Sequence, residues 1–374
     1  MLIHPAHTLP FDELVAGLRS AREQRLVYER PGPDDLVLYL YSEHCVYEGS
    51  WTPITLAARG LIVDLAARRI VATPFPKFFN AGERGEPIPD LAFETTEKLD
   101  GSLIIIFHHR GRWRTATKGA FNSAQALWAQ GRLDTLNLSS LKPGTTYLAE
   151  ATYAENRIVV HYADPALRML AAYGETGCEV AWTDLVGTSE AVGIEPAARF
   201  EYGSLSDLIE KAKILPRTEE GFVLRFANGL RLKIKGNEYK RIHALVSNLT
   251  PLAMWQAMAA GMDMASIRRE LPEEFWADFD SIIAILDSQI RSIVDRVAAT
   301  ARAVQDLPDK EVGLRLATFD DAVRSFIFMF RKSGGDLLSG RNREKVFRAI
   351  RPTNNELAGY VPSYAMNRVN DESG

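Results

Sequence analysis

The chain has 374 residues, of which 46% are hydrophobic and 25% are charged, and its formal net charge is −4. This length predicts two domains or one large one, and the composition is that of a protein with packed cores. The net charge excludes a uniformly basic nucleic-acid-binding protein, so any surface for nucleic acid has to be local.

The two cysteines, Cys45 and Cys178, form no CxxC motif and have no metal-ligand spacing. They argue against a disulfide scaffold and a zinc site and predict a reducing compartment. The N-terminus lacks the pattern of a signal peptide, and no apolar run is long enough to span a bilayer. We therefore expect a cytoplasmic protein without a membrane partner.

The first 240 residues read mostly as short strands. Runs rich in β-branched and aromatic residues, separated by Gly, Pro or Asn, predict strands at 36–42, 60–65, 69–75, 102–109, 157–162, 221–226 and 230–235. Asn228-Gly229, between the last two runs, is a strong hairpin signal. Helical pieces are predicted at 11–23 and 123–132.

The pattern becomes helical after about residue 240. Apolar residues at three- and four-residue steps predict a long amphipathic helix within 272–304, and TFDDAVRSFIFMFRKS and NREKVFRAI predict further helices. The expected fold class is α+β, with an antiparallel-sheet domain over 1–240 followed by an all-helical domain over 241–374. The last stretch, PTNNELAGYVPSYAMNRVNDESG, is expected to be either a flexible tail or an ordered cap.

The stretch EKLDGSLIIIF at 97–107 has two interpretations. Asp100-Gly101 between two strand-like runs is typical of a hairpin turn, and Lys98 is then a surface lysine beside the turn. The same Lys-x-Asp-Gly pattern is the nucleophile signature of enzymes that carry a nucleotide on a lysine. The motif alone decides little, so the remaining residues have to be weighed with it.

A lysine that attacks the α-phosphate of a nucleotide needs helpers. Cations neutralise the triphosphate and lower the pKa of the lysine, carboxylates hold a divalent metal and the ribose, and a flat apolar side chain faces the base. The chain offers such residues in order: Arg59 in ARGLIVD, Lys77 and Phe79 in PKFFN, Lys118 in ATKGA, Glu150 in YLAEATYAENRIVVHY, Glu220 in EEGFVLRF, and Lys233 and Lys235 in RLKIKG.

Lys233 and Lys235 are two residues apart, so in a strand both side chains face the same side. An anion between them would relieve their repulsion. The alternative for this Lys-Ile-Lys is an edge strand protected by charge.

These motifs make the chain resemble bacteriophage-type RNA ligase 1, a family of ATP-dependent RNA end-joining enzymes within the covalent nucleotidyltransferases. ARG, PKFFN, KLDGSL, TKG, ENRIV, EGFV and KIK carry the resemblance over about residues 36–240. PKFFN and NRIV distinguish this family from DNA ligases and capping enzymes, which also usually continue into a small β-barrel domain. Leu99 departs from the family, which usually has an acidic residue after the nucleophile.

The resemblance implies that Lys98 forms a lysyl–AMP from ATP and passes the AMP to an RNA 5′-phosphate. An RNA 3′-hydroxyl then attacks that activated end and releases AMP. The resemblance implies roles in nucleotide binding for Arg59, Lys77, Phe79, Tyr39, Lys118 and Gly101, the last by close backbone approach to the adenylate. Glu150 and Glu220 would organise the ribose and Mg²⁺ or Mn²⁺. Lys233 and Lys235 would grip the α-phosphate and keep Lys98 partly neutral, and Tyr239 matches a further essential position.

The most basic segment is 331–351, which suits either a phosphate-contacting surface or a solvated helix face. Its candidate RNA contacts are Arg331, Lys332, Arg341, Arg343, Lys345 and Arg348. The resemblance implies RNA with 5′-phosphate and 3′-hydroxyl ends as partner, with nicked tRNA as one candidate. It also implies a separate end-healing kinase and phosphatase, since no GxxxxGK[ST] motif is present.

Three other functions stay open from the sequence. They are a DNA ligase, a capping-type enzyme that uses GTP, and a catalytically inactive RNA-binding protein with a ligase fold.

Overall fold

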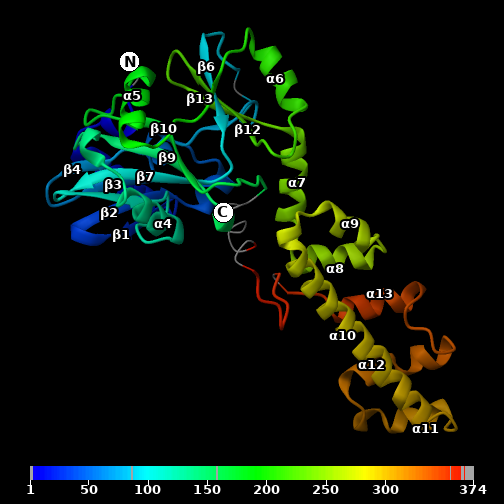
Figure 1. Ribbon diagram of the computed structural model, residues 1–374. Helices are drawn as coiled ribbons and strands as arrows, with labels where there is room; N and C mark the ends of the chain where they lie inside the picture. The colour runs from blue at the N-terminus through cyan, green and yellow to red at the C-terminus, as the bar shows by residue number, and fades with distance from the viewer. Residues whose placement is uncertain (1–2, 86, 157–158, 354, 364–365, 367–374) are drawn as a thin grey trace. The chain divides into compact units, whose positions relative to one another are not determined.

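The structure is a computed structural model that describes residues 3–85, 87–156, 159–353, 355–363 and 366. The chain divides into two compact units, Met1–His243 and Ala244–Ser373, and the division falls within α7 (Asn237–Ser247) (Figure 1). Unit 1 combines sheets and helices, and the described part of unit 2 contains helices and no named strand. The predicted α+β class is therefore confirmed.

Unit 1 contains three sheets. The first has the order β1 (Val27–Pro31), β2 (Leu36–Tyr41), β3 (Arg59–Asp64), β4 (Arg69–Ala72). The second has the order β10 (Ala166–Tyr173), β9 (Thr146–Thr152), β7 (Ser102–His109), β8 (Arg112–Ala116). The third has the order β11 (Arg199–Phe200), β6 (Phe93–Lys98), β12 (Gly221–Phe226), β13 (Arg231–Lys235), β5 (Phe79–Asn80). The strand pairs are antiparallel, apart from the short parallel pair of β13 and β5.

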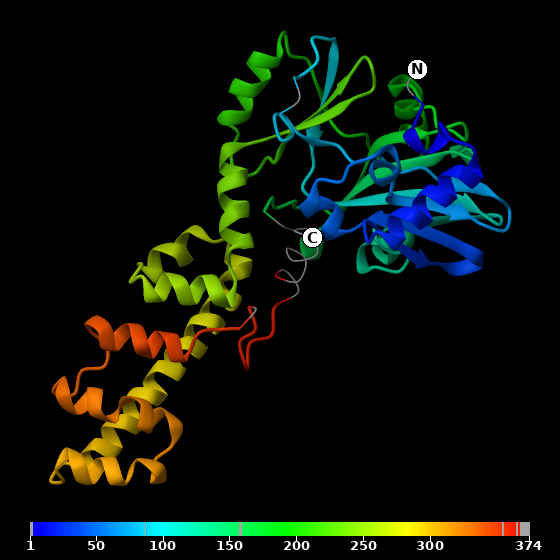
Figure 2. The same cartoon turned by 180° about the vertical axis from the view of Figure 1, so that it is seen from behind.

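The first two sheets pack face to face. Each of them carries apolar side chains on both faces, and one apolar face of each sheet packs against the other sheet. The core between them includes Leu38, Ile62, Ile105 and Leu148. The outer face of the first sheet is covered by α1 (Phe11–Glu23) and α3 (Pro53–Ala57), and Figure 2 shows α1 in blue across the strands. The outer face of the second sheet is covered by α4 (Ala124–Leu133) and α5 (Trp182–Val192).

The third sheet has one apolar and one polar face. Phe222, Leu224 and Ile234 pack against α6 (Leu205–Lys213), which covers the apolar face. The pairing register places Lys98 and Lys235 on either side of Gly221, and therefore on the opposite face. This polar face carries the basic side chains of the KIK motif.

Asp100-Gly101 is not a hairpin turn. The strand before it, β6, belongs to the third sheet, and the strand after it, β7, belongs to the second. The turn chemistry of Asp-Gly is the same in both cases, but here the chain crosses from one sheet to the other. Lys98 is therefore the last residue of a strand at the junction of two sheets.

The strand predicted at 157–162 is wrong for residues 159–162, which the structure describes without regular structure. The backbone N–H groups of Val159 and Val160 donate to the Asp100 carboxylate instead of to a neighbouring strand. Arg157 and Ile158, the centre of the ENRIV motif, lie outside the described residues. The strands β9 and β10 flank this region, and neither was among the strand ranges predicted from the sequence.

Unit 2 is built around α10 (Trp276–Ala303), preceded by a short 3-10 turn at Glu273–Phe275. Its buried residues follow the predicted spacing and include Phe279, Leu286 and Val297. The other helices are α8 (Pro251–Ala259), α9 (Met264–Glu270), α11 (Asp309–Leu314), α12 (Asp321–Lys332) and α13 (Gly340–Ala349). None of the helices within the described ranges has the length and apolar character needed to cross a bilayer.

The segment after α13 runs back along α10. The Tyr360 hydroxyl and the Ser363 backbone N–H both donate to Asp278 Oδ1 at 2.8 Å. The described part of this segment is therefore attached to the first turn of α10. Residues 367–374, the end of the expected tail, lie outside the described residues.

A buried ion pair links the third sheet to the end of β10. Arg231 on β13 pairs with Glu179, and the two side chains are only 9% and 12% exposed. Arg225 on β12 also reaches Glu179, at 3.0 Å, but its side chain is 32% exposed. Glu179 bridges to Tyr173 at the end of β10.

We expect Arg231→Ala to lower the free energy of unfolding of unit 1 by about 3 kcal/mol, because it leaves a buried carboxylate short of its partner. Arg225→Ala is the matched control and should cost about 1 kcal/mol or less, since that pair is more exposed. Urea unfolding followed by near-UV circular dichroism measures both. Equal losses for the two variants would contradict a special role for the Arg231 pair.

Candidate active site

Three neighbouring strands bring Lys98, Glu220 and Lys235 together. Gly221 pairs with Lys98 on one side and with Lys235 on the other, and Glu220 directly precedes it. Glu220 Oε2 accepts a hydrogen bond from Lys98 Nζ at 2.7 Å, and Oε1 lies 3.0 Å from Lys235 Nζ. Gly221 has a φ of +148°, and a Cβ there would lie 2.0 Å from the Ile234 carbonyl oxygen. Only glycine therefore allows the strands to hold this arrangement.

The carboxylate of Glu220 is 2% exposed, and its two lysine partners favour its ionised form. Burial alone would raise its pKa, but Lys98 and Lys235 lower the pKa below its ordinary value. The lysines thus make it possible to bury this charge.

The carboxylates around Lys98 favour its ammonium form. Burial is the largest single influence and lowers the pKa of Lys98, but Glu220, Glu150 and Asp100 together raise the pKa above its ordinary value. The prediction that the neighbouring lysines keep Lys98 partly neutral is therefore wrong for this arrangement of side chains. The carboxylates that face Lys98 outweigh the cations.

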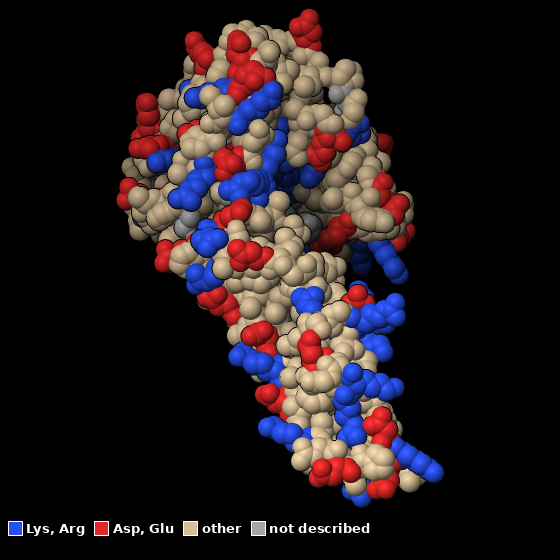
Figure 3. Space-filling model, turned by 90° about the vertical axis from the view of Figure 1, so that its right-hand side faces the viewer, with Lys and Arg blue, Asp and Glu red and all other residues tan. Residues whose placement is uncertain are grey.

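Lys233 is the lysine whose proton is weakly held. Burial, and then the charges of Lys98, Lys77, Arg59 and Lys235, lower its pKa to about 7. On the face of the molecule seen in Figure 3, Lys and Arg side chains gather around a hollow on unit 1. Such a concentration of positive charge favours an anion with several negative charges.

Arg59 has an unsatisfied donor at this cluster. Its guanidinium lies 5.2 Å from the centre of the Phe78 ring, and Lys233 Nζ lies 5.8 Å from the same ring. Arg59 Nη1 is buried and has no hydrogen-bond partner within the described part of the chain. A buried donor beside other cations is the arrangement that a phosphate oxygen would complete.

A bulge in β3 directs Arg59 to this place. The register shifts so that Leu61 pairs with Tyr39 while Arg59 pairs with Leu40, which leaves Gly60 without a cross-strand partner in the ladder. Gly60 has a φ of +95°, and a Cβ on it would lie 2.9 Å from Lys118 Cα. The bulge thus sets the ARG motif directly against the backbone of the TKG motif.

Lys77 lies in a cage of aromatic rings. Its Nζ is 5.2, 5.4 and 5.5 Å from the ring centres of Tyr41, Trp51 and Phe79. Trp51 packs edge-to-face on both other rings, at 5.2 Å from Tyr41 and 5.3 Å from Phe79. Burial raises the pKa of Tyr41, but Arg59, Lys77 and Lys118 together lower it. These cations therefore surround Tyr41.

Tyr39 does not belong to this site, and its expected nucleotide contact is wrong. Its side chain is fully buried in the core against α1, and its hydroxyl donates to Glu29 Oε2 at 3.1 Å. The tyrosine at the site is Tyr41, two residues later. Tyr41 is the last residue of β2, beyond the part of the strand that α1 covers. Its place at a strand end is the feature from which its role at the site could have been predicted.

Asp100 holds the surroundings of the nucleophile together. It is 2% exposed, and its Oδ2 accepts the backbone N–H groups of Val159 and Val160 at 2.8 and 2.7 Å. Its Oδ1 accepts the Tyr239 hydroxyl at 2.8 Å, and its own N–H donates to the Tyr162 hydroxyl at 2.8 Å. Burial and the nearby Glu220 raise the pKa of Asp100. The Asp of the motif therefore has a positioning role, which was not expected from the sequence.

Gly101 is required by the approach of a neighbouring strand. A Cβ at this position would lie 2.3 Å from the Ala151 carbonyl oxygen and 3.1 Å from Glu150 Cγ. The close approach brings Glu150 of β9 near Lys98, whose pKa it raises. The observed constraint is thus with β9, and an approach of Gly101 to an adenylate stays a prediction.

Two of the arginines expected to contact RNA have internal partners. Arg331 donates to the carbonyl oxygens of Val304 and Leu307 at 2.9 and 2.7 Å. Arg343 donates to the carbonyl oxygens of Met258 and Ala259 at the end of α8. Both guanidinium groups satisfy helix ends, which corrects their assignment as RNA contacts. The remaining four residues, Lys332, Arg341, Lys345 and Arg348, are exposed.

A protein-family model matches the part of the chain that carries most of this site. Residues 57–239 match the model of the RNA ligase family. This segment contains the site residues from Arg59 to Tyr239, whereas Tyr41 and Trp51 precede it. The resemblance to bacteriophage-type RNA ligase 1 is confirmed for that segment.

Two sequence relatives are viral. A protein of Autographa californica nuclear polyhedrosis virus, described as a bifunctional polynucleotide kinase/RNA ligase, is 29% identical over 222 residues, or 51% of this chain and 31% of the relative. An RNA ligase of Rhodothermus phage RM378 is 22% identical over 209 residues, or 44% of this chain and 46% of the relative. The chain thus spans less than half the length of either relative.

Solved structures of ligases are distant neighbours. An archaeal ATP-dependent RNA ligase is 15% identical and covers 98% of each chain with a TM-score of 0.49. A Naegleria gruberi RNA ligase with pyrophosphate is 15% identical, covers 41% of this chain and 51% of its own, and has a TM-score of 0.34.

The ammonium of Lys233 should lose its proton with a midpoint near pH 7, because burial and the surrounding cations disfavour the charged form. Since the pKa in the unfolded chain is near 10.5, this charge opposes folding fully below pH 7, and the opposition fades between pH 7 and 10.5. Lys233→Met should therefore stabilise the protein most at or below pH 7. A ¹³C-NMR titration of the lysine Cε signals, with Lys233→Met to assign the signal, measures the midpoint. A midpoint above pH 10 would contradict this description of the site.

Proposed function

Because residues 57–239 match the model of the RNA ligase family, we propose that the whole chain is an ATP-dependent RNA ligase that joins 5′-phosphate and 3′-hydroxyl ends. The observation that carries the proposal is the place of Lys98 at the strand end, hydrogen-bonded to Glu220 and faced by a cluster of cations. An amine nucleophile next to a polyanion-binding cluster suits attack on a nucleotide phosphate.

In the first step the lone pair of Lys98 Nζ attacks the α-phosphorus of ATP. A P–N bond forms, the bond from the α-phosphorus to the bridging oxygen breaks, and diphosphate leaves. Lys98 has to lose a proton before its nitrogen can attack, and its hydrogen bond to Glu220 Oε2 at 2.7 Å orients the side chain. Arg59, Lys77, Lys233 and Lys235 neutralise the charge of the triphosphate.

In the second step an oxygen of the RNA 5′-phosphate attacks the same phosphorus, and the P–N bond breaks to restore the amine of Lys98. In the third step the RNA 3′-hydroxyl attacks the 5′-phosphate, a phosphodiester forms and AMP leaves. The amide-like nitrogen of the lysyl–AMP carries no ammonium charge. Glu220 therefore loses one of its lysine partners during the cycle.

Glu150 and Glu220 fit a divalent cation such as Mg²⁺ or Mn²⁺ that keeps most of its water. No cluster of three or more His, Cys, Asp or Glu side chains suited to a metal occurs in the described parts of the chain. A hard cation held by one or two carboxylates, phosphate oxygens and water matches the way in which proteins bind Mg²⁺ with a nucleotide. Both Glu220 oxygens already accept lysines, so Glu150 suits the cation better until Lys98 has reacted. When bound, the metal would withdraw charge from the phosphates.

The proposed RNA substrate and partners follow from the sequence and from one viral relative. The viral relative described as a bifunctional polynucleotide kinase/RNA ligase combines end healing and joining by name. This chain has no GxxxxGK[ST] motif, so a separate kinase and phosphatase are the proposed suppliers of its ends. Nicked tRNA remains our proposed example of such a substrate, and the free Cys45 and Cys178 support a reducing, cytoplasmic location.

The proposal predicts that the protein becomes labelled when it is incubated with α-labelled ATP and Mg²⁺ and then denatured. Lys98→Ala should abolish the label, whereas Lys142→Ala, which changes an exposed lysine of the same unit, should not. GTP should label poorly, and the labelled enzyme should join RNA in preference to DNA. Absence of label from folded wild-type protein with either nucleotide would favour an inactive RNA-binding protein.

Arg59→Ala should slow formation of the labelled enzyme by about 100-fold, because it removes a donor preorganised for a phosphate. Its stability should change little, since Nη1 has no hydrogen-bond partner within the described residues. Arg112→Ala, an exposed arginine in the same unit, is the control. A wild-type labelling rate for Arg59→Ala would remove this residue from the site.

A further inference from the structure

The aromatic cage of Lys77 contains one residue, Trp51, to which the proposed chemistry gives no role. Trp51 lies in the linker between α2 (Glu43–Glu48) and α3. Its ring packs on the other two rings, 5.2 Å from Tyr41 and 5.3 Å from Phe79, and its centre lies 5.4 Å from Lys77 Nζ. Trp51 therefore contacts every other member of the cage.

Buried side chains fix the backbone on both sides of Trp51. The Ser50 carbonyl oxygen accepts hydrogen bonds from Cys45 Sγ at 3.3 Å and Thr55 Oγ1 at 2.9 Å, and both donors belong to buried residues. On the other side, Thr52 caps α3 through reciprocal hydrogen bonds with Thr55 of 2.8 and 3.3 Å. The position of Trp51 is thus set independently of its ring contacts.

The same short helix also fixes Lys77. The Lys77 backbone N–H donates to the Leu56 carbonyl oxygen of α3 at 2.8 Å. The ring of Trp51 and the backbone of Lys77 are therefore anchored at the two ends of one helix of five residues. A cation that is held in place before its ligand arrives loses little conformational entropy on binding.

Lys77 differs from the lysines around Glu220 in how its charge is held. Lys98 and Lys235 each contact one oxygen of Glu220. No salt bridge of Lys77 occurs in the described part of the chain, and three aromatic rings surround its ammonium instead. Aromatic faces attract a cation without carrying a net negative charge. The cage therefore holds Lys77 without a carboxylate that would compete with a phosphate for it.

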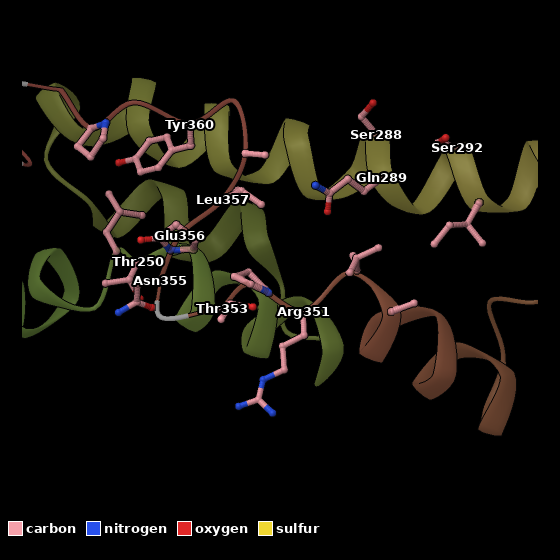
Figure 4. A pocket seen from close by; sticks show the side chains of 18 of the residues that line it. Thr250, Ser288, Gln289, Ser292, Arg351, Thr353, Asn355, Glu356, Leu357 and Tyr360 are labelled. Carbon is pink, nitrogen blue, oxygen red and sulfur yellow. The ribbon is translucent and has the colours of Figure 1, made fainter. Parts of the chain in front are cut away.

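A cation within three rings is a special arrangement in this chain. Arg351, which lines a cavity of unit 2 (Figure 4), lies over one ring, that of Trp255, at 5.6 Å from its centre. Every other cation that lies over a ring within the described residues also faces one ring only. The rings around Lys77 therefore form a built feature of the site.

We propose that Trp51 is a positioning residue for nucleotide binding, whose ring holds the Lys77 ammonium where it contacts the phosphates of ATP. This inference rests on the proposed function, since that function supplies ATP as the ligand. Trp51 acts through Lys77 and makes no contact of its own with the phosphates. Its effect therefore depends on the presence of Lys77 and on an aromatic face at position 51.

The test measures the affinity of the full chain for an ATP analogue in which a methylene group joins the α- and β-phosphorus, so that Lys98 cannot react. Isothermal titration calorimetry with Mg²⁺ gives the dissociation constant. Trp51→Leu keeps an apolar side chain without an aromatic face, and it should weaken binding about 5-fold through loss of one cation–π contact. Trp51→Phe keeps a face and should bind within about 2-fold of wild type.

A double-mutant cycle shows whether Trp51 acts through Lys77. Lys77→Met removes the charge and keeps an unbranched side chain. In that background Trp51→Leu should change the affinity by less than about 2-fold, because its partner is already absent. Trp182→Leu is the matched control, since Trp182 is a half-buried tryptophan on α5 that lies 5.0 Å from the Arg199 guanidinium. It should bind the analogue as wild type does.

Equal losses for Trp51→Leu with and without Lys77, or equal losses for Trp51→Phe and Trp51→Leu, would overturn the proposal. Either result indicates general packing or a direct contact of the indole N–H with the nucleotide. Wild-type affinity of Trp51→Leu would overturn the proposal as well.

Labelling of the same preparations with α-labelled ATP separates this inference from the ligase function. Normal labelling of wild-type protein, with no coupling between Trp51 and Lys77, would reject the role of Trp51 alone. No labelling of wild-type protein, with the analogue still bound and the two residues still coupled, would reject the ligase function and leave the role of Trp51 standing. Failure of wild-type protein to bind the analogue would reject both.

Discussion

The site of unit 1 depends on one buried carboxylate, Glu220, held between two lysines. Burying a single charge is costly, and an ion pair in the interior is stable only when its geometry and hydrogen bonds are nearly complete. Glu220 meets this condition through Lys98 and Lys235, one for each oxygen. The strand register follows from it, because Gly221 has to lie between the two lysines for Glu220 to reach both.

Around Glu220 and its two lysines, the site has more cationic side chains than carboxylates to pair with them. Lys233 is left with a weakly held proton, and Arg59 is left with a buried donor that has no partner among the described residues. Such features reduce the stability of a folded chain, and they occur where a protein is arranged for a ligand rather than for its own stability. A nucleotide triphosphate would supply the missing negative charge. The aromatic cage of Lys77 has the same character, because it holds a cation in place beside apolar rings.

Unit 2 uses its arginines in two ways. Arg331 and Arg343 complete the carbonyl groups at helix ends, which are otherwise unsatisfied, whereas Arg341 and Arg348 face solvent. In the sequence both kinds belong to one basic segment. A cluster of basic residues in a sequence therefore indicates either structural arginines or a surface for an anionic ligand. The contacts of each guanidinium distinguish the two.

Elements whose causes are local could be predicted from the sequence. Local residue patterns predict α1, β7 and β12 with the bounds that the structure has, and Asn228-Gly229 predicts the hairpin between β12 and β13. The residue types at Lys98, Glu220, Lys233 and Lys235 likewise pointed to one chemistry, because few reactions need that combination.

The directions in which these side chains face, and their contacts, depend on tertiary packing. Asp-Gly has the same local conformational preferences in a hairpin and in a crossover between sheets, so the position of Lys98 depended on the pairing of β6 with β12. The β-rich run at 157–162 is no strand where the structure describes it, since the buried Asp100 captures its N–H groups from 59 and 60 residues away in sequence. Tyr39 and Tyr41 share one strand and one residue type, yet the packing of α1 over the first of them leaves the second at the site. In each case the deciding partner lies far away along the chain, and local preferences carry no information about it.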